Sequence, residues 1–358
     1  MQSAGFAPAR REGTVQTWED SPVPVTLPTL DEVLASAHVV TLSMRVRFRG
    51  VIVREALLLD GPHGWGEFAP FVEYDDEEAA AWLASGIEAA WQGWPAARRD
   101  RVAVNATVPA VGADQVHAIL DRFGDCGTVK IKVAEAGQTL ADDIARVRAV
   151  RDARPEAAIR VDANGAWSVD EALTALRSLG EVGLQYAEQP CGTVDDLVAL
   201  RELLDREHVQ VALAADESIR KADDPLRVAR TGAIDVAVVK VAPLGGVVRT
   251  LEVADELSRL GVRLVVSSAL DTSVGIAAGV AAAAALPSEP LACGLGTVAL
   301  FSSDVCADPL LPTSGWLSAR PSAPVPDPER FAAMPDRTQW WLDRLVRCWR
   351  VLDSRRAA

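Results

Sequence analysis

Three acidic side chains follow three successive apolar runs in the middle of the chain. Asp162 ends AIRVD, Glu188 ends LQYAE, and Asp216 follows VALAA. If these runs are parallel strands, their carboxyl ends meet at one edge and the three carboxylates converge. Converging carboxylates repel one another unless a cation joins them, and an all-oxygen ligand set selects a hard ion. The spacing therefore predicts a Mg²⁺ site held by these three residues.

Lysines end the runs on either side of the acids. Lys130 and Lys132 lie two residues apart in TVKIKV, so a strand places both on one face, and Lys240 ends DVAVVK. We expect the two close lysines to lower each other's pKa, and the metal to lower both, so that one acts as a base near neutral pH. This combination predicts removal of a proton next to a carboxylate, with a metal-stabilised enediolate as the product of that step.

Other polar residues beside these strand ends complete the predicted site. Asn164 and Glu217 are expected to orient the ligands and lysines, and Asn164 is also a candidate substrate contact. The run RLVVSSA carries Ser267 and Ser268 near its end, two further candidate substrate contacts, and Asp271 is expected to lie behind them. Each residue alone has an ordinary structural explanation, such as a helix cap or a salt bridge. Their occurrence on successive strands favours a functional site.

The turn from Gly294 to Thr297 follows the last apolar run of this region. Its backbone N–H groups are candidate donors to a substrate carboxylate, so Gly294 and Thr297 are predicted substrate contacts. The alternative is a tight turn required where the sheet closes on itself. The sequence leaves both interpretations open.

Short apolar runs alternate with amphipathic segments from about residue 101, which is typical of repeated βα units. The runs span 102–108, 128–133, 158–164, 184–190, 211–218, 235–241, 263–269 and 291–297. Eight strands of this kind predict an α/β fold with a (β/α) barrel. A doubly wound open sheet is the alternative, and it is weakened because no G-x-G-x-x-G turn follows the first strand.

The segments on either side of this region predict a second structural unit. Residues 1–28 are polar and rich in proline, and a short helix is expected to begin after Thr29, with Glu32 in a capping box. Residues 39–61 alternate apolar and polar positions as an antiparallel hairpin, and GPHGWGEFAPF is expected to be a loop. A helix capped by Asp75 or Asp76 follows.

Two further helices are expected towards the C-terminus. The alanine-rich stretch 275–286 is too short to cross a bilayer and predicts a buried helix. In the final helix, Trp341, Leu345 and Trp349 recur at core spacing, so we expect it to pack on the N-terminal unit.

The composition excludes several function classes. The chain has 36 basic and 50 acidic residues, a net charge of −14, and is therefore a poor binder of nucleic acid or anionic membrane. None of the four histidines pairs with another at short range, which argues against a histidine-built zinc site. The five scattered cysteines fit reduced thiols in the cytoplasm, and no targeting or membrane-spanning segment is expected.

The chain resembles the muconate-lactonizing subgroup of the enolase superfamily from about residue 40 to the C-terminus. The motifs are the K-x-K of KIKV, the D-x-N of VDANG, the E-Q-P of YAEQP, the D-E-S of AADES and the lysine of VVKVAPLGG. The resemblance implies a modified (β/α)7β barrel at 101–299. It also implies an α+β capping domain at 29–100, completed by 300–358, and an N-terminal extension, 1–28, that matches nothing in the family.

The resemblance also implies roles for individual residues. Asp162, Glu188 and Asp216 correspond to the Mg²⁺ ligands, and Lys132 and Lys240 correspond to the acid–base lysines, whose pairing with Mg²⁺ is a known arrangement of this superfamily. Lys130 corresponds to the residue that supports Lys132. The implied partner is a small-molecule carboxylate.

Three stretches, GWGEFAPFVEYD, SSALDTSVG and GLGTVALFSSDV, are similar to the actinobacterial o-succinylbenzoate synthase family of menaquinone biosynthesis. This likeness implies dehydration of 2-succinyl-6-hydroxy-2,4-cyclohexadiene-1-carboxylate to o-succinylbenzoate. Lys132 would remove the α proton and protonate the leaving hydroxide, while Lys240 would stabilise the enediolate. An N-acylamino-acid racemase or dipeptide epimerase is the alternative, because two lysines also serve that reaction. A scaffold that had lost catalysis would lack a ligand or a lysine, and none is missing.

Overall fold

The computed structural model describes residues 27–48, 51–220, 224–319 and 324–357. The predicted extension, residues 1–28, lies outside this range except for its last two residues. Among the described residues, no helix has the length and apolar character needed to cross a bilayer.

A curled parallel sheet of seven strands forms the larger part of the molecule, in the order β11-β10-β9-β8-β7-β6-β5. The strands are β5 (Ala106–Val108), β6 (Thr128–Lys132), β7 (Ala158–Asp162), β8 (Leu184–Glu188), β9 (Leu213–Ala215), β10 (Val236–Lys240) and β11 (Arg263–Ser267). Two isolated bridges, Val104 to Cys293 and Ser267 to Gly294, join the edges of this sheet. The predicted barrel is therefore confirmed, but its eighth strand at 291–297 is reduced to these bridges.

The first predicted strand, 102–108, is divided in two. Its beginning is β4 (Arg101–Ala103), which pairs antiparallel with β12 (Trp316–Ser318), and its end is β5. Asn105 lies between them, where its backbone N–H donates to the carbonyl of Cys293 at 3.1 Å. The predicted strand is divided here because β4 pairs with β12 in an antiparallel ribbon, whereas β5 pairs with β6 in the parallel sheet.

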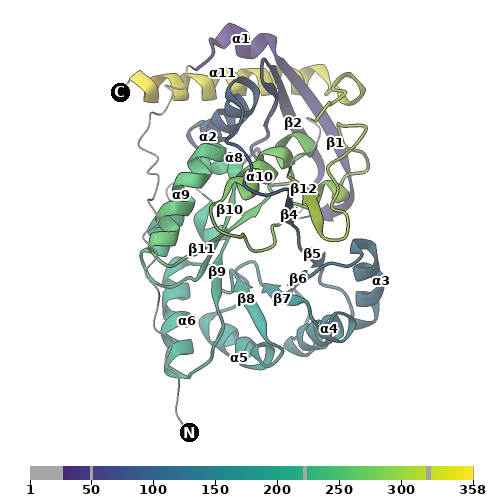
Figure 1. The fold of residues 1–358 in the computed structure, drawn as a ribbon, viewed down its shortest axis with the longest axis vertical. Coiled ribbons are helices and arrows are strands. Elements are labelled where there is room, and N and C mark those ends of the chain that lie inside the picture. Colours follow the sequence, from purple (N-terminus) through teal and green to yellow (C-terminus); the bar gives the residue numbers. More distant parts are fainter. Residues whose placement is uncertain (1–26, 49–50, 221–223, 320–323, 358) are drawn as a thin grey trace.

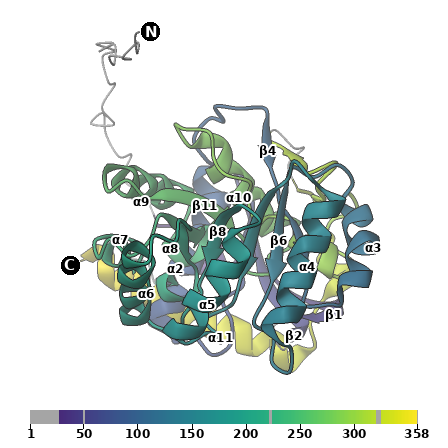
Figure 2. The same cartoon turned by 90° about the horizontal axis from the view of Figure 1, so that it is seen from below.

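Helices cover the outside of the barrel, as Figure 2 shows for α4, α5 and α6. They are α3 (Val116–Leu120), α4 (Leu140–Ala153), α5 (Val169–Gly180), α6 (Val194–Arg206), α7 (Asp224–Ala229), α8 (Val241–Leu244), α9 (Val247–Arg259) and α10 (Ser273–Ala285). Short 3-10 turns lie at Ala113–Gln115, Asp121–Phe123, Glu217–Ile219, Thr297–Leu300 and Glu329–Phe331. Thr139, Ser168 and Thr193 begin α4, α5 and α6, because each hydroxyl accepts a backbone N–H of the first turn. The predicted buried helix at 275–286 corresponds to α10.

A second unit, here called the cap, consists of a three-stranded antiparallel sheet and the helices packed on it. It contains α1 (Leu30–Ala35), β1 (Ala37–Phe48), β2 (Val51–Gly61), β3 (Gly64–Phe68), α2 (Asp76–Ile87), the π-helix Glu88–Gln92 and α11 (Pro335–Ala357). The capping box of Thr29 and Glu32, the hairpin, and the capping of α2 by Asp75 are confirmed.

The prediction of a loop at GWGEF is wrong, because these residues form β3 and pair with β2. The glycine that suggested a loop instead allows close packing. A Cβ on Gly66 would lie 1.9 Å from the carbonyl oxygen of Gly86, so β3 can rest against α2 only without a side chain there.

The C-terminal helix α11 packs on the cap, as predicted, and Figure 1 shows it lying across α2. Trp341 and Leu345 are fully buried, and the indole N–H of Trp341 donates to Glu55 at 3.0 Å. Arg344 donates to the carbonyl oxygens of Phe71 and Tyr74. Helix α11 thus joins the first described elements of the chain in one unit.

Candidate active site

The predicted acids meet at the carboxyl ends of β7, β8 and β9. Asp162 and Glu188 are register partners on adjacent strands, and Asp216 follows the end of β9. Their exposed fractions are 0%, 1% and 3%. Three carboxylates buried in one place need counter-charges, because an isolated buried charge is costly.

Lysine ammonium groups supply these counter-charges. Lys130 Nζ lies 2.7 Å from Glu188 Oε1 and 2.9 Å from Asp162 Oδ2, and Lys132 Nζ lies 2.6 Å from the same Asp162 oxygen. Lys240, arriving from β10, forms an ion pair with Asp216. The sequence pattern grouped these six residues correctly, and the structure brings each lysine into contact with at least one of the acids.

The predicted lowering of the lysine pKa is wrong for Lys130. Burial disfavours its charged form, but the carboxylates of Asp162 and Glu188 outweigh burial and hold the pKa of Lys130 well above its ordinary value. In return, Lys130 and Lys132 overcome the burial of Asp162 and hold its pKa below the ordinary range. Burial, followed by the neighbouring acids, raises the pKa of Glu188 to about 7. Direct carboxylate contacts therefore decide the charge of Lys130, rather than the like charge of Lys132.

The donor set suits a hard divalent cation, although the side chains are engaged with lysines. Among the described residues, no group of three His, Cys, Asp or Glu side chains is arranged as it stands to hold a metal ion. Glu188 Oε2, however, is buried and has no hydrogen-bond partner among those residues. A buried oxygen of this kind needs a cation or a hydrogen-bond donor. The other two predicted ligands, Asp162 and Asp216, are also carboxylates, so the predicted ligand set contains oxygen atoms only. The residues present thus fit a metal with oxygen preference.

Asn164 and Glu217 lie beside Lys132, where the sequence predicted orienting residues. Lys132 Nζ donates to Asn164 Oδ1 at 2.7 Å, and Asn164 Nδ2 donates to Glu217 Oε1 at 3.1 Å. Asn164 has a φ of 49°, in the left-handed region that asparagine tolerates better than most residues. This backbone turn directs its amide towards Lys132. Contact of Asn164 with substrate stays a prediction.

The residues predicted to bind substrate also meet, at the closure between β11 and residues 293–297. Ser268 Oγ lies 2.7 Å from Thr297 Oγ1 and donates to the carbonyl of Gly294 at 3.1 Å. The N–H of Gly294 donates to the carbonyl of Val266 at 2.8 Å, and a Cβ there would lie 2.6 Å from Ser267 Oγ. For Gly294, the structure therefore favours the alternative of a barrel-closing turn, because its N–H is already used by the sheet.

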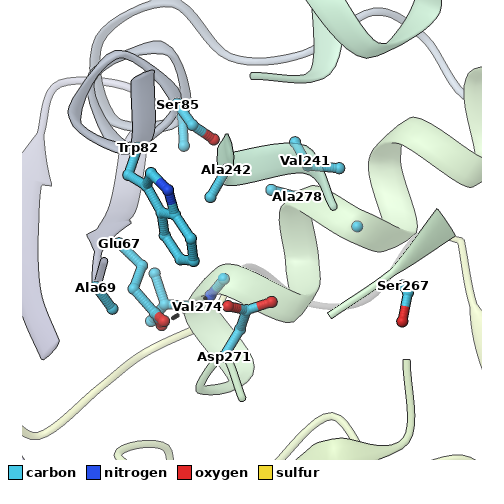
Figure 3. Close-up of a pocket in the computed structure, with 13 residues that line it drawn as sticks. Glu67, Ala69, Trp82, Ser85, Val241, Ala242, Ser267, Asp271, Val274 and Ala278 are labelled. Carbon is cyan, nitrogen blue, oxygen red and sulfur yellow. Dashed lines mark hydrogen bonds between the residues drawn. The ribbon is translucent and has the colours of Figure 1, made fainter. Parts of the chain in front are cut away.

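Sequence reasoning missed Glu67 of β3, which lies beneath this closure. Glu67 and Asp271 line an enclosed space of about 20 Å³ between the cap and the barrel, with Trp82 and Ser267 at its walls (Figure 3). Burial and then the charge of Asp271 raise the pKa of Glu67 to about 8. A signal was present, because Glu67 is an acid within the apolar and glycine-rich stretch GWGEFAPF.

Two family models match the chain, and together they cover both units. The model described as enolase N-terminal domain-like matches residues 39–90. The model described as enolase C-terminal domain-like matches residues 112–324.

Several curated relatives are similar over almost the whole chain. A protein of Mycolicibacterium smegmatis named o-succinylbenzoate synthase is 57% identical over 326 residues, covering 90% of this chain and 98% of the relative. One from Mycobacterium leprae with the same name is 55% identical over 331 residues, covering 91% and 95%. One from Mycobacterium tuberculosis, also so named, is 54% identical over 334 residues, covering 92% and 98%.

Solved structures show the same fold. A probable mandelate racemase from Alicyclobacillus acidocaldarius has a TM-score of 0.67 at 26% identity, covering 83% of this chain and 95% of that one. The muconate lactonizing enzyme of Pseudomonas putida has a TM-score of 0.68 at 21% identity, covering 83% and 98%. At this level of identity, the second likeness concerns the fold alone.

Proposed function

The chain belongs to the enolase superfamily, and from this premise we propose how its lysines and acids carry out the o-succinylbenzoate synthase reaction. The enzyme is a lyase that dehydrates a cyclohexadiene carboxylate bearing a succinyl chain, as the likeness to the mycobacterial synthases over nine-tenths of the chain indicates. Its partner is a small-molecule carboxylate. The assignment of individual roles is our proposal.

One observation carries the proposed mechanism: two lysines face the acidic cluster from opposite sides. Lys132 extends from β6 and Lys240 from β10, with β7, β8 and β9 between them in the sheet. A substrate carboxylate placed between these strands has an amine on each face. Such a placement suits removal of a proton from one face and electrostatic stabilisation from the other.

In the proposed reaction, Lys132 in its neutral form takes the proton from the ring carbon that bears the carboxylate. The electron pair passes into an enediolate, whose collapse expels the ring hydroxyl as hydroxide. The Lys132 ammonium then returns its proton to that hydroxide, so water leaves, the ring becomes aromatic, and the lysine is regenerated. Lys240 remains charged and stabilises the enediolate, while Asn164 holds Lys132 Nζ in place.

Asp162, Glu188 and Asp216 are the residues that would hold a divalent cation, which we propose to be Mg²⁺. When bound, such an ion supplies Lewis-acid stabilisation of the carboxylate oxygens during enediolate formation. The all-oxygen donor set and the unpartnered Glu188 Oε2 among the described residues support this proposal. Lys130, with its raised pKa, keeps a positive charge between two of these acids.

The compartment and the range of partners are also part of the proposal. The five cysteines are all buried and free of disulfides, which suits the reducing cytoplasm. The net charge of −14 disfavours nucleic acid and anionic membranes as partners.

The decisive assay follows loss of the cyclohexadiene absorbance with purified protein and Mg²⁺. We expect turnover by the natural protein and a loss of at least a thousandfold in kcat for Lys132→Ala, because its general base is gone. Retained turnover in Lys132→Ala would refute the assigned base. Failure to dehydrate this compound, together with racemisation of N-succinyl amino acids, would instead support the racemase alternative.

A further inference from the structure

Two glutamates of the cap reach the N-termini of two barrel helices. Glu88 accepts the backbone N–H groups of Val247 at 2.6 Å and Val248 at 3.0 Å, at the start of α9. Glu67 accepts the N–H groups of Thr272 and Gly275, each at 3.1 Å, and the hydroxyl of Thr272, at the start of α10. Each carboxyl group thus supplies, from the other unit, an acceptor for the unpaired amides of a helix end.

Both helix ends are shaped to admit these carboxylates. A Cβ on Gly246 would lie 2.5 Å from a carboxylate oxygen of Glu88. A Cβ on Gly275 would lie 2.8 Å from Cβ of Asp271 and 3.0 Å from Cδ of Glu67. Glycine at these two positions is therefore required by the close approach of the cap to the barrel.

The loop between β11 and α10 is also held by a second cap residue. Arg54 of β2 is buried and donates to the carbonyls of Leu270 at 3.2 Å and Ala269 at 3.3 Å. Within the loop, Asp271 accepts the N–H of Ala269 at 3.1 Å, and Leu270 has a φ of 60°. A leucine in the left-handed region is strained, so outside contacts must hold it.

This loop follows β11, the strand that pairs with the Lys240 strand. It continues from Ser267, whose Cα is the register partner of Lys240, and it includes Ser268. Figure 3 shows the side chain of Glu67 close to that of Asp271, which is itself part of this loop. A shift of the loop would therefore move the side of the barrel that carries Lys240.

We propose that Glu67 is a positioning residue for the dehydration: by capping α10 from the cap, it fixes the loop 268–272 and with it the Lys240 side of the site. The expected effect on kcat rests on the proposed function. The claim that Glu67 fixes the loop 268–272 does not depend on that function. Glu67 touches neither the acids nor the lysines of the site in any contact found among the described residues, so it acts through the loop.

Two substitutions should disrupt the capping of α10 by Glu67, and one should preserve it. Glu67→Leu keeps the approximate volume but offers no acceptor, and Gly275→Ala forces the carboxylates away. Glu67→Gln keeps one acceptor oxygen for α10 and presents an N–H to Asp271, so it should rescue the function. Gly279→Ala, one turn further along α10, is the matched control, because its Cβ would press on the end of the Leu295 side chain, 2.6 Å from Cδ2, and on neither Glu67 nor Asp271.

Hydrogen–deuterium exchange and steady-state kinetics at pH 7 together test the proposal. We expect Glu67→Leu and Gly275→Ala to speed exchange in residues 268–276 by at least tenfold and to lower kcat by at least tenfold, with KM changed less than threefold. Glu67→Gln and Gly279→Ala should stay within threefold of the natural protein in both. Exchange and kcat unchanged in both disruptive variants would overturn the proposal, as would loss of activity without faster exchange.

The kinetic claim and the structural claim of this proposal can fail separately. If the natural protein does not dehydrate the substrate, the proposed function fails and the exchange result alone decides the structural claim. If Glu67→Leu does not fold, the comparison of Gly275→Ala with Gly279→Ala still decides whether the proposal holds. A uniform loss of stability without a kcat effect would overturn the positioning role and assign Glu67 a structural role only.

Discussion

At the scale of residues, the site is a balance of buried charges. Lys130 compensates Asp162 and Glu188 at once, and Lys132 shares the Asp162 oxygen. The identity of these residues was predictable, because strand ends with alternating faces bring them together. The raised pKa of Lys130 was not, because it depends on distances of 2.7–2.9 Å that no spacing reveals. Glu67 was missed for a similar reason, since its partners follow it by about two hundred residues.

Removal of Lys130 should expose this balance. Lys130→Met leaves two buried carboxylates without their shared cation, so in EDTA the free energy of unfolding should fall by about 3 kcal/mol. Mg²⁺ should restore much of this loss, because a divalent ion neutralises the same carboxylates. Urea unfolding with EDTA and with Mg²⁺ measures both values. Lys132→Met is the comparison measured alongside it, because the Lys132 ammonium also contacts Asp162, together with the side-chain oxygen of Asn164. An equal loss in EDTA and Mg²⁺ would contradict the metal assignment.

At the scale of elements, the regular strands and helices were predictable from hydrophobic period and capping, and the exceptions are caused by tertiary contacts. The stretch GWGEF became β3 because Gly66 permits contact with α2, which the residue type alone could not distinguish from a loop. Residues 291–297 became two bridges because Cys293 and Gly294 face different neighbours, Val104 and Ser267. Both deviations are set by tertiary partners.

The cap of α9 offers an energetic test at this scale. Its N-cap Gly246 has no side chain, so Glu88 is the acceptor that the structure provides for Val247 and Val248. Glu88→Ala should lower the free energy of unfolding by about 2 kcal/mol, at the upper end for capping residues, because two amides lose their acceptor. Glu32→Ala, which removes an exposed capping-box partner from α1, should cost about 0.5 kcal/mol. Equal losses in urea unfolding would contradict the cross-unit role of Glu88.

At the scale of the whole molecule, we propose a division into a cap, 29–100, and a barrel, 101–299, with 300–358 completing the cap. The last segment contributes to both units. α11 packs on α2, whereas β12 pairs with β4 at the start of the barrel. Sequence suggested that the two ends meet, because Trp341 and Leu345 form an apolar face in need of a partner. Apolar packing joins cap and barrel as well, for example between Leu42 and Leu270. The polar contacts of Glu67 and Glu88 could not be predicted, because each depends on a single residue whose partner lies far along the chain.

Glu67 makes the stability of this assembly depend on pH. Its ordinary pKa of 4.5 is raised to about 8 by burial first and then by Asp271, while Arg54 and the bonds from α10 act in the opposite direction. Burial lowers the pKa of the Arg54 guanidinium and raises that of the Cys306 thiol, and the charge of Glu67 in turn raises both pKa values. Between pH 4.5 and 8 the folded chain binds more protons than the unfolded chain. The contribution of Glu67 to the free energy of unfolding therefore falls as the pH rises from 4.5, and it levels off above 8.

Glu67→Gln removes that titration while keeping an acceptor for α10. We therefore expect the variant to gain stability relative to the natural protein as pH rises from 5 to 8, with the two nearly equal at pH 5. The difference between the two urea-unfolding curves at each pH reports the titration of the Glu67–Asp271 pair, because Asp162, whose lowered pKa acts in the opposite sense at acid pH, is common to both. A difference that is constant from pH 5 to 9 would show that Glu67 keeps one charge state throughout this range.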